Sequence, residues 1–139
     1  MGAVARLYLA VAAGAAIGGT GRAVISLAML RIAGPGFPWG TLAANVAGSF
    51  LIGLYATLTE PGGRLIAGAR TRQFVLTGIC GGFTTFSLFS LETLRLVAAR
   101  AHALAAANVG LSALAWLLAV WAGAALGQRL NRLPGAGAR

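Results

Sequence analysis

Long apolar runs separated by short polar breaks make up most of this chain. The runs fall at about 7–30, 39–58, 74–91 and 103–126, and each is close to the ~20 residues that a helix needs to cross a bilayer. The last three runs contain no charged residue, and the first contains only Arg22. The breaks are rich in Pro, Gly and Arg, and Pro and Gly commonly end helices. The pattern therefore predicts an all-α membrane protein with four transmembrane helices.

Small residues recur at every fourth position in several of these runs. Gly14 is followed by Gly18, and Gly123 by Gly127. This spacing lets two helix backbones approach closely in lipid, so we expect these glycines at helix contacts.

Polar residues inside the runs also recur at helical spacing. Thr41, Asn45 and Ser49 share one helical face, and Asn108 and Ser112 share another. Polar side chains in hydrocarbon are costly without partners, so these faces should point into protein or water. Two interpretations stay open, namely hydrogen bonds that hold helices together and donors that line a pathway. The third run adds the hydroxyls of Thr84, Thr85, Ser87 and Ser90. Three polar faces together with a broken helix favour the pathway.

The third run contains the stretch GGFTTFSLFS at residues 81–90. Gly78, Gly81 and Gly82 cluster near its middle, and glycine weakens a helix. Opened backbone inside a bilayer is tolerated only where protein or water satisfies it. We therefore expect the helix to break at these glycines, with the neighbouring hydroxyls satisfying the opened groups. Freed carbonyls there suit a cation, whereas the N-terminus of a half-helix suits an anion.

Two phenylalanines, Phe86 and Phe89, lie three residues apart in the same stretch and share a helical face. The positive edge of a phenyl ring attracts an anion. The alternative is that both rings simply pack or face lipid, and the spacing does not decide between the two.

The composition excludes several classes of protein. Hydrophobic residues make up 58% and charged residues 9%, against about 25% charged in soluble domains. The net charge of +9 comes from arginines at the ends of apolar runs, which indicates lipid headgroup contacts and not nucleic acid. Cys80 is the only cysteine, so no intrachain disulfide forms. The connections are short, so we expect no soluble catalytic site and no enzyme.

The arginines also predict an orientation. Four spans place both termini and the second connection on one side, and the positive-inside rule makes that side cytoplasmic. The opposite side carries Arg31, Arg95 and Arg100. The termini side carries more, namely Arg6, Arg64, Arg70, Arg72, Arg129, Arg132 and Arg139.

Titratable groups separate a passive channel from a coupled transporter. A proton-coupled exporter of the small four-helix multidrug type needs a carboxylate or histidine within the membrane. Glu92 is the candidate, but its position near the end of the run and three residues before Arg95 favours a local ion pair or a role at the helix end. His102 falls in a connection. A passive channel fits this pattern better than the exporter, and a non-transporting subunit would not need the polar faces.

Motifs in all four runs resemble one family of membrane proteins. GGFTTFSLFS followed by Glu92 resembles the GG-x-TTFSTF-S signature of the small fluoride channels, the Fluc or CrcB family. PWGTLAANVAGSFLIG at residues 38–53 resembles the family's second-helix motif. GAAIGGTGR is similar to its first helix and NVGLSALAW to its fourth. Leu88 stands where the common motif has threonine, a departure that bears on conductance and need not alter selectivity.

The resemblance implies a passive fluoride-selective channel that exports cytoplasmic fluoride down its gradient. It also implies an antiparallel, dual-topology homodimer in the inner or plasma membrane, with two narrow pores and a structural sodium ion at its centre. Main-chain carbonyls of the broken helix hold this Na⁺, and they fall here at Gly81 and Thr84. The uneven arginines leave open an inverted homologue as the partner.

The resemblance assigns further positions. The pore-lining phenylalanines map to Phe86 and Phe89, and Asn45 would donate to the ion at a vestibule, where Arg22 also lies. The remaining pore positions are Thr85, Ser87 and Ser112. Because fluoride is small and strongly hydrated, such a pore must replace water with hydrogen-bond donors.

Overall fold

The computed structural model describes residues 2–133, and all regular secondary structure within them is helical, with no strand. Three apolar runs form the uninterrupted helices α1 (Ala3–Ala33), α2 (Trp39–Leu58) and α6 (His102–Asn131). The third run is divided into α3 (Ala69–Gln73), the π-helical segment η1 (Phe74–Cys80), α4 (Gly81–Phe83) and α5 (Phe86–Ala98). Four helical stretches are long and apolar enough to cross a membrane, which confirms the predicted all-helical fold with four long apolar helices.

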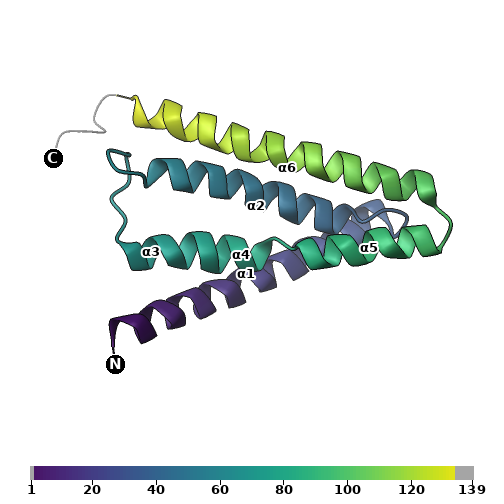
Figure 1. The fold of residues 1–139 in the computed structure, drawn as a ribbon, viewed down its shortest axis with the longest axis horizontal. Coiled ribbons are helices and arrows are strands. Elements are labelled where there is room, and N and C mark those ends of the chain that lie inside the picture. Colours follow the sequence, from purple (N-terminus) through teal and green to yellow (C-terminus); the bar gives the residue numbers. More distant parts are fainter. Residues whose placement is uncertain (1, 134–139) are drawn as a thin grey trace.

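Two pairs of elements form the bundle (Figure 1). α2 lies along α6, and α1 crosses the third stretch where η1 meets α4. The start of α1, the α2–α3 connection and the end of α6 lie at the same end of the bundle, and the α1–α2 and α5–α6 connections lie at the other. The described arginines of the termini side therefore gather at one end, and Arg139 lies outside the described residues.

Glycines bring the paired helices together, as their spacing predicted. A methyl group on Gly123 of α6 would collide with the carbonyl oxygen of Phe50 in α2. On α1, a methyl group on Gly14 would come within 2.5 Å of the Phe74 carbonyl oxygen, and one on Gly18 would collide with that of Ile79. No larger residue leaves room for these contacts, so the glycines set the helix separations.

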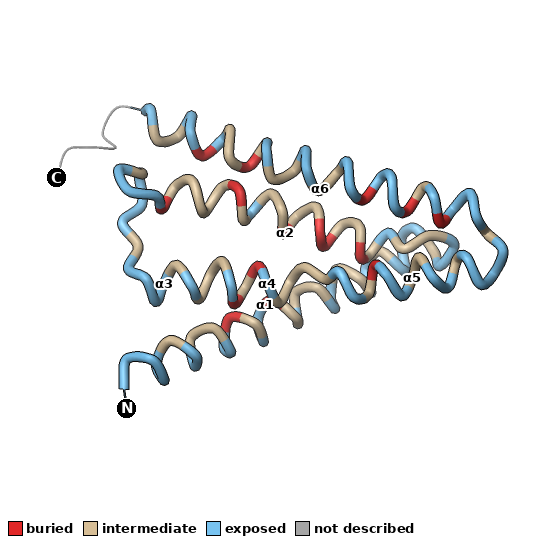
Figure 2. Tube along the Cα trace, in the orientation of Figure 1, coloured by how far each residue is buried: buried red, intermediate tan, exposed pale blue. Residues whose placement is uncertain are grey.

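The outer surface of the bundle is apolar, and several of its most buried side chains are polar. Among the buried residues are Thr41, Asn45, Asn108 and Ser112, whereas large aliphatic side chains are widely exposed. On α6 the buried positions lie on the side facing α2 (Figure 2). This distribution suits a protein embedded in a lipid bilayer, because lipid covers the apolar outer surface and the polar groups find partners inside the bundle.

The third helix is broken, as predicted, but not at the glycines. Gly81 has helical angles, with φ −64° and ψ −38°, whereas Thr84 (φ −87°, ψ 155°) and Thr85 (φ −151°, ψ 123°) are extended. The predicted location was therefore wrong by about one turn. The reason is that a Cβ on Gly82 would lie 2.5 Å from the carbonyl oxygen of Ala15 in α1. This glycine permits close packing of a helix that continues through it.

Candidate functional site

One side chain from α2 satisfies the backbone where the third helix opens. The Nδ2 of Asn45 donates to the Thr85 carbonyl oxygen at 2.9 Å, and the Thr85 N–H donates to Oδ1 of Asn45 at 2.7 Å. Asn45 is 4% exposed. A single amide therefore replaces both of the backbone partners that Thr85 would have in a helix. One of its two Nδ2 hydrogens stays free to donate elsewhere.

The two threonines at the break complete the ends of both half-helices. The Thr84 hydroxyl and the Thr84 N–H both donate to the Cys80 carbonyl at 3.0 Å. The Thr85 hydroxyl oxygen accepts the Leu88 N–H at 3.2 Å, which caps the N-terminus of α5. It also lies 3.2 Å from the Ser87 hydroxyl. The expectation that hydroxyls satisfy the opened backbone is confirmed.

Arg22 approaches the break from α1. Its Nε donates to the Gly82 carbonyl oxygen at 3.3 Å. The side chain is therefore paired with a main-chain carbonyl next to the break, and its positive charge lies beside the opened backbone.

Main-chain oxygens near the break fit a hard monovalent cation. Hydrogen bonds at the break engage the carbonyls of Cys80, Gly82 and Thr85. Within the described residues, none goes to the carbonyls of Gly81 or Thr84. The last carbonyls of a helix lack partners within it. The described residues contain no group of three or more His, Cys, Asp or Glu side chains suited to a metal. A cation here would depend on carbonyl oxygens.

The two phenylalanines differ in their surroundings. Phe89 is 8% exposed and Phe86 is 71% exposed, with their ring centroids 5.5 Å apart. Phe89 also meets Trp116 of α6 edge-on, with centroids 5.0 Å apart and planes at 74°. Phe89 is thus held by packing, and the Phe86 ring stays available at the surface of the chain.

A cavity of about 200 Å³ lies directly beside the break. It brings the polar face of α2 together with the opened backbone and the exposed phenyl ring. Its lining consists of Asn45, Ser49, Ile52, Thr84, Thr85, Phe86 and Trp116.

Trp116 is a residue of this region that the sequence analysis missed. It lines the cavity, and its indole Nε1 is buried without an acceptor among the described residues. The sequence feature that could have indicated Trp116 is its position four residues after Ser112, which places both on the same face of α6. A lone aromatic residue in an apolar helix is too common for that signal to stand out.

Ser112 lies apart from this cavity. Its hydroxyl donates to Asn108 Oδ1 at 3.4 Å, and Asn108 Nδ2 donates to the Thr93 hydroxyl oxygen at 2.9 Å. The first bond lies within α6, and the second joins α6 to α5. The structure therefore brings Asn45, Thr85 and Phe86 together at one cavity, and it places Ser112 in a buried link between helices.

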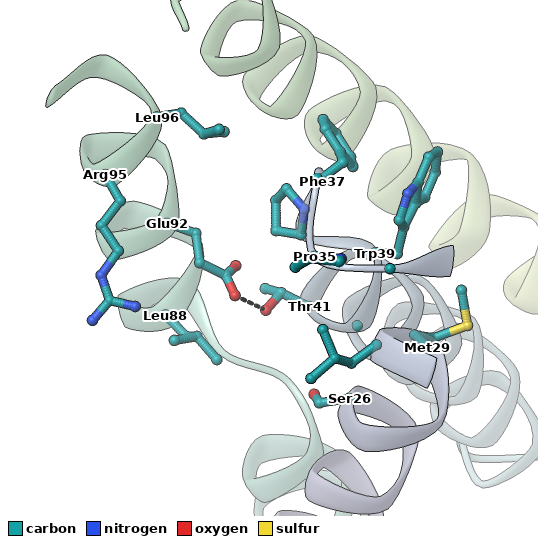
Figure 3. Close-up of a pocket in the computed structure, with 15 residues that line it drawn as sticks. Ser26, Met29, Pro35, Phe37, Trp39, Thr41, Leu88, Glu92, Arg95 and Leu96 are labelled. Atoms are coloured by element: carbon teal, nitrogen blue, oxygen red, sulfur yellow. Dashed lines mark hydrogen bonds between the residues drawn. The ribbon is translucent and has the colours of Figure 1, made fainter. Parts of the chain in front are cut away.

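Glu92 pairs across the bundle and not along its own helix. The Thr41 hydroxyl of α2 donates to Glu92 Oε1 at 2.9 Å (Figure 3), and within the described residues Glu92 forms no salt bridge with Arg95. The predicted local ion pair with Arg95 is therefore wrong. The reason is that Thr41, 51 residues away in the sequence, lies on the facing side of α2 and offers a donor inside the bundle.

Comparison with known proteins identifies relatives that match almost the entire chain. The family model described as "CrcB-like protein, Camphor Resistance (CrcB)" matches residues 9–124. A protein of Rhodopseudomonas palustris named as a fluoride-specific ion channel is 55% identical over 132 residues, which cover 94% of this chain and 93% of the relative. A fluoride-specific ion channel of Opitutus terrae is 50% identical over 129 residues, covering 93% and 98%. These matches agree with the motifs in all four apolar runs, and the chain belongs to the CrcB family.

Proposed function

We propose that this protein is a passive channel that conducts fluoride selectively and lets cytoplasmic fluoride leave the cell down its electrochemical gradient. The relatives in its family are named as fluoride-specific ion channels, so the protein is a membrane channel and not an enzyme. The observation that carries the proposal is the cavity at the break, where donors and a phenyl ring meet in the middle of a membrane span.

The donors at this cavity suit a small anion that must lose water. Asn45 retains one N–H hydrogen after its bond to Thr85. Thr85 lines the cavity, and its hydroxyl shares a single bond with that of the neighbouring Ser87, which lies outside the lining. The Thr85 oxygen also accepts the Leu88 N–H. Of the two hydroxyl hydrogens, one therefore remains to donate. These groups, with the positive edge of the Phe86 ring, replace water molecules around the ion.

The positive charge of Arg22 near the break also favours an anion in the pathway. The Arg22 guanidinium is bonded to the Gly82 carbonyl, so a fixed positive charge lies close to the pathway. A positive charge at the entrance to a narrow passage raises the local concentration of anions. Arg22 thus attracts the ion, and the neutral donors of the cavity bind it.

The proposal includes an antiparallel homodimer with a structural sodium ion, or an inverted homologue as the partner. The 71% exposure of Phe86 supports a second chain, because a ring in the pathway needs a facing wall. The carbonyls of Gly81 and Thr84 would hold the sodium ion, which supplies positive charge that stabilises the paired chains. The described arginines at the termini end predict cytoplasmic termini for the more frequent orientation.

Purified protein in liposomes tests the proposed activity. With a fluoride gradient, we expect fluoride efflux that a fluoride electrode records, with no change when a proton gradient is imposed. Empty liposomes and a chloride gradient of equal size are the controls. Chloride efflux as fast as that of fluoride would refute selectivity, and uptake driven by a proton gradient would instead support the coupled exporter.

A further inference from the structure

The connection between α2 and α3 lies at the end of the bundle that also carries the start of α1 and the end of α6 (Figure 1). α2 has 20 residues, and at ~1.5 Å per residue such a helix spans the ~30 Å hydrocarbon core of a bilayer. The residues that follow Leu58 therefore emerge at the depth of the lipid headgroups.

Hydrogen bonds tie this connection to the ends of α2 and α6. The Arg64 N–H donates to Asn131 Oδ1 at 2.8 Å, and the Arg64 guanidinium donates to the Leu130 carbonyl oxygen at 3.1 Å. The Leu65 N–H donates to the Leu58 carbonyl oxygen at 2.9 Å. The surface that the connection presents is therefore set by the protein itself.

An apolar tip follows directly after these bonds. The Ile66 side chain is 98% exposed, and that of Leu65 is 45% exposed. An aliphatic side chain of this size gains free energy by leaving water, and none of the protein covers Ile66 within the described residues. At headgroup depth, the hydrocarbon that can cover this tip is that of the lipid acyl chains.

Positive charge at the same end of the bundle has little to balance it. Arg22 and Arg64 are the arginines whose side chains donate hydrogen bonds within residues 2–133, so the guanidinium groups of Arg70 and Arg72 in α3 have no acceptor there. One carboxylate, Glu60, belongs to this end. The described arginines at this end are Arg6, Arg64, Arg70, Arg72, Arg129 and Arg132.

We propose that the Ile66 tip and the guanidinium groups of Arg70 and Arg72 form a binding surface for an anionic phospholipid. Arg70 and Arg72 donate charge-assisted hydrogen bonds to the headgroup phosphate, and Ile66 enters among the acyl chains. A free phosphate ion would not use Ile66, and the ammonium group of a zwitterionic lipid would offset the attraction to the arginines. None of these residues lines the cavity at the break. Lipid binding is measured without ion flux, so its failure is distinguishable from failure of the proposed conduction.

Native mass spectrometry of the lipid-depleted, full-length protein in detergent tests this surface. The probes are dioleoyl phosphatidylglycerol, which is anionic, and dioleoyl phosphatidylcholine, which has the same chains and no net charge. We expect saturable binding of phosphatidylglycerol that is about tenfold tighter than that of phosphatidylcholine. Arg70→Gln combined with Arg72→Gln should remove most of this preference. Arg31→Gln combined with Arg95→Gln is the matched control, because it removes the same charge at the opposite end of the bundle, and it should leave the preference unchanged.

Two further measurements test the apolar tip and the source of the phosphate. Ile66→Ser should weaken the binding of both lipids several-fold without changing their ratio, and it removes no packing because the side chain is exposed. Glycerol phosphate, which lacks acyl chains, should not displace phosphatidylglycerol. Equal affinity for the two lipids, equal loss of preference in both double variants, unchanged binding in Ile66→Ser, or displacement by glycerol phosphate would each overturn the proposal. If the variant with Arg70→Gln and Arg72→Gln does not elute as a folded protein, the comparison of the two lipids and Ile66→Ser decide.

Discussion

The contact between α2 and α6 and the break at Thr84–Thr85 are both interior parts of one small bundle. Along α2 and α6 the backbone satisfies itself, and glycines such as Gly123 remove side chains so that the helices approach. At the break the backbone is open, and Asn45, Thr84 and Thr85 add side-chain groups to satisfy it. In this protein, glycine therefore marks packing, and amides and hydroxyls mark the place where a helix opens.

The largest effect should come from filling the packed contact. In Gly123→Leu, the added side chain meets the Phe50 carbonyl, and neither backbone can move away without separating the helices. We expect almost no monodisperse protein in size-exclusion chromatography. Gly110→Leu on the same helix is the control, because a Cβ there has no neighbour within 4 Å. Normal elution of Gly123→Leu would show that the α2–α6 contact adapts.

The next largest effect should come from removing the amide at the break. Asn45→Ala leaves the N–H and the carbonyl of Thr85 without their partners. We expect the free energy of unfolding to fall by about 2–4 kcal/mol, measured by denaturation in mixed SDS micelles. Ser49→Ala lines the same cavity one turn away and serves as the control. Equal stability of the two variants would mean that water replaces the amide at the break.

Phe86→Ile should separate function from stability. The ring is 71% exposed, so its loss should leave the free energy of unfolding unchanged while fluoride efflux from liposomes falls about tenfold, or about 1.4 kcal/mol. Trp121→Leu is the control, since Trp121 is 70% exposed on α6 and does not line the cavity. Efflux at the unaltered rate would make Phe86 a surface aromatic without a role in conduction.

A smaller effect should follow from Thr85→Val, which keeps the shape of the side chain but removes its hydroxyl. The loss of the cap on Leu88 N–H should cost about 1 kcal/mol of stability. Efflux should fall a few-fold, because one donor at the cavity disappears. Thr85→Ser retains the hydroxyl and should restore both quantities. A Ser variant as impaired as the Val variant would assign the role of Thr85 to its methyl group.

The smallest effect should come from Leu88→Thr, which introduces the threonine of the family motif. Leu88 does not line the cavity at the break; it lines a larger cavity of about 410 Å³ between the α1–α2 connection and α5. We therefore expect fluoride efflux to change by less than about threefold, with the ratio of fluoride to chloride efflux unaltered. A change in that ratio would bring the larger cavity into the selectivity mechanism.

The sequence predicts the four helices well because the bilayer fixes both their length and their apolar composition. The existence of a break in the third run was also predicted correctly, from the glycines that cluster there. Its position was not, because the role of Gly82 depends on the backbone of Ala15 in another helix. Glu92 shows the same limit. Its neighbour in sequence suggested an ion pair, but its actual partner is 51 residues away.

Exposure of the Phe86 ring has a consequence for how conduction depends on the amount of protein. In the proposed dimer, one copy of the chain supplies only one side of the passage, so conduction would begin with an encounter between two copies. At low density in the membrane, total flux should then rise with the square of the number of chains, and in direct proportion once pairing is complete. Cells that hold few copies would gain far more than twofold tolerance from doubling them.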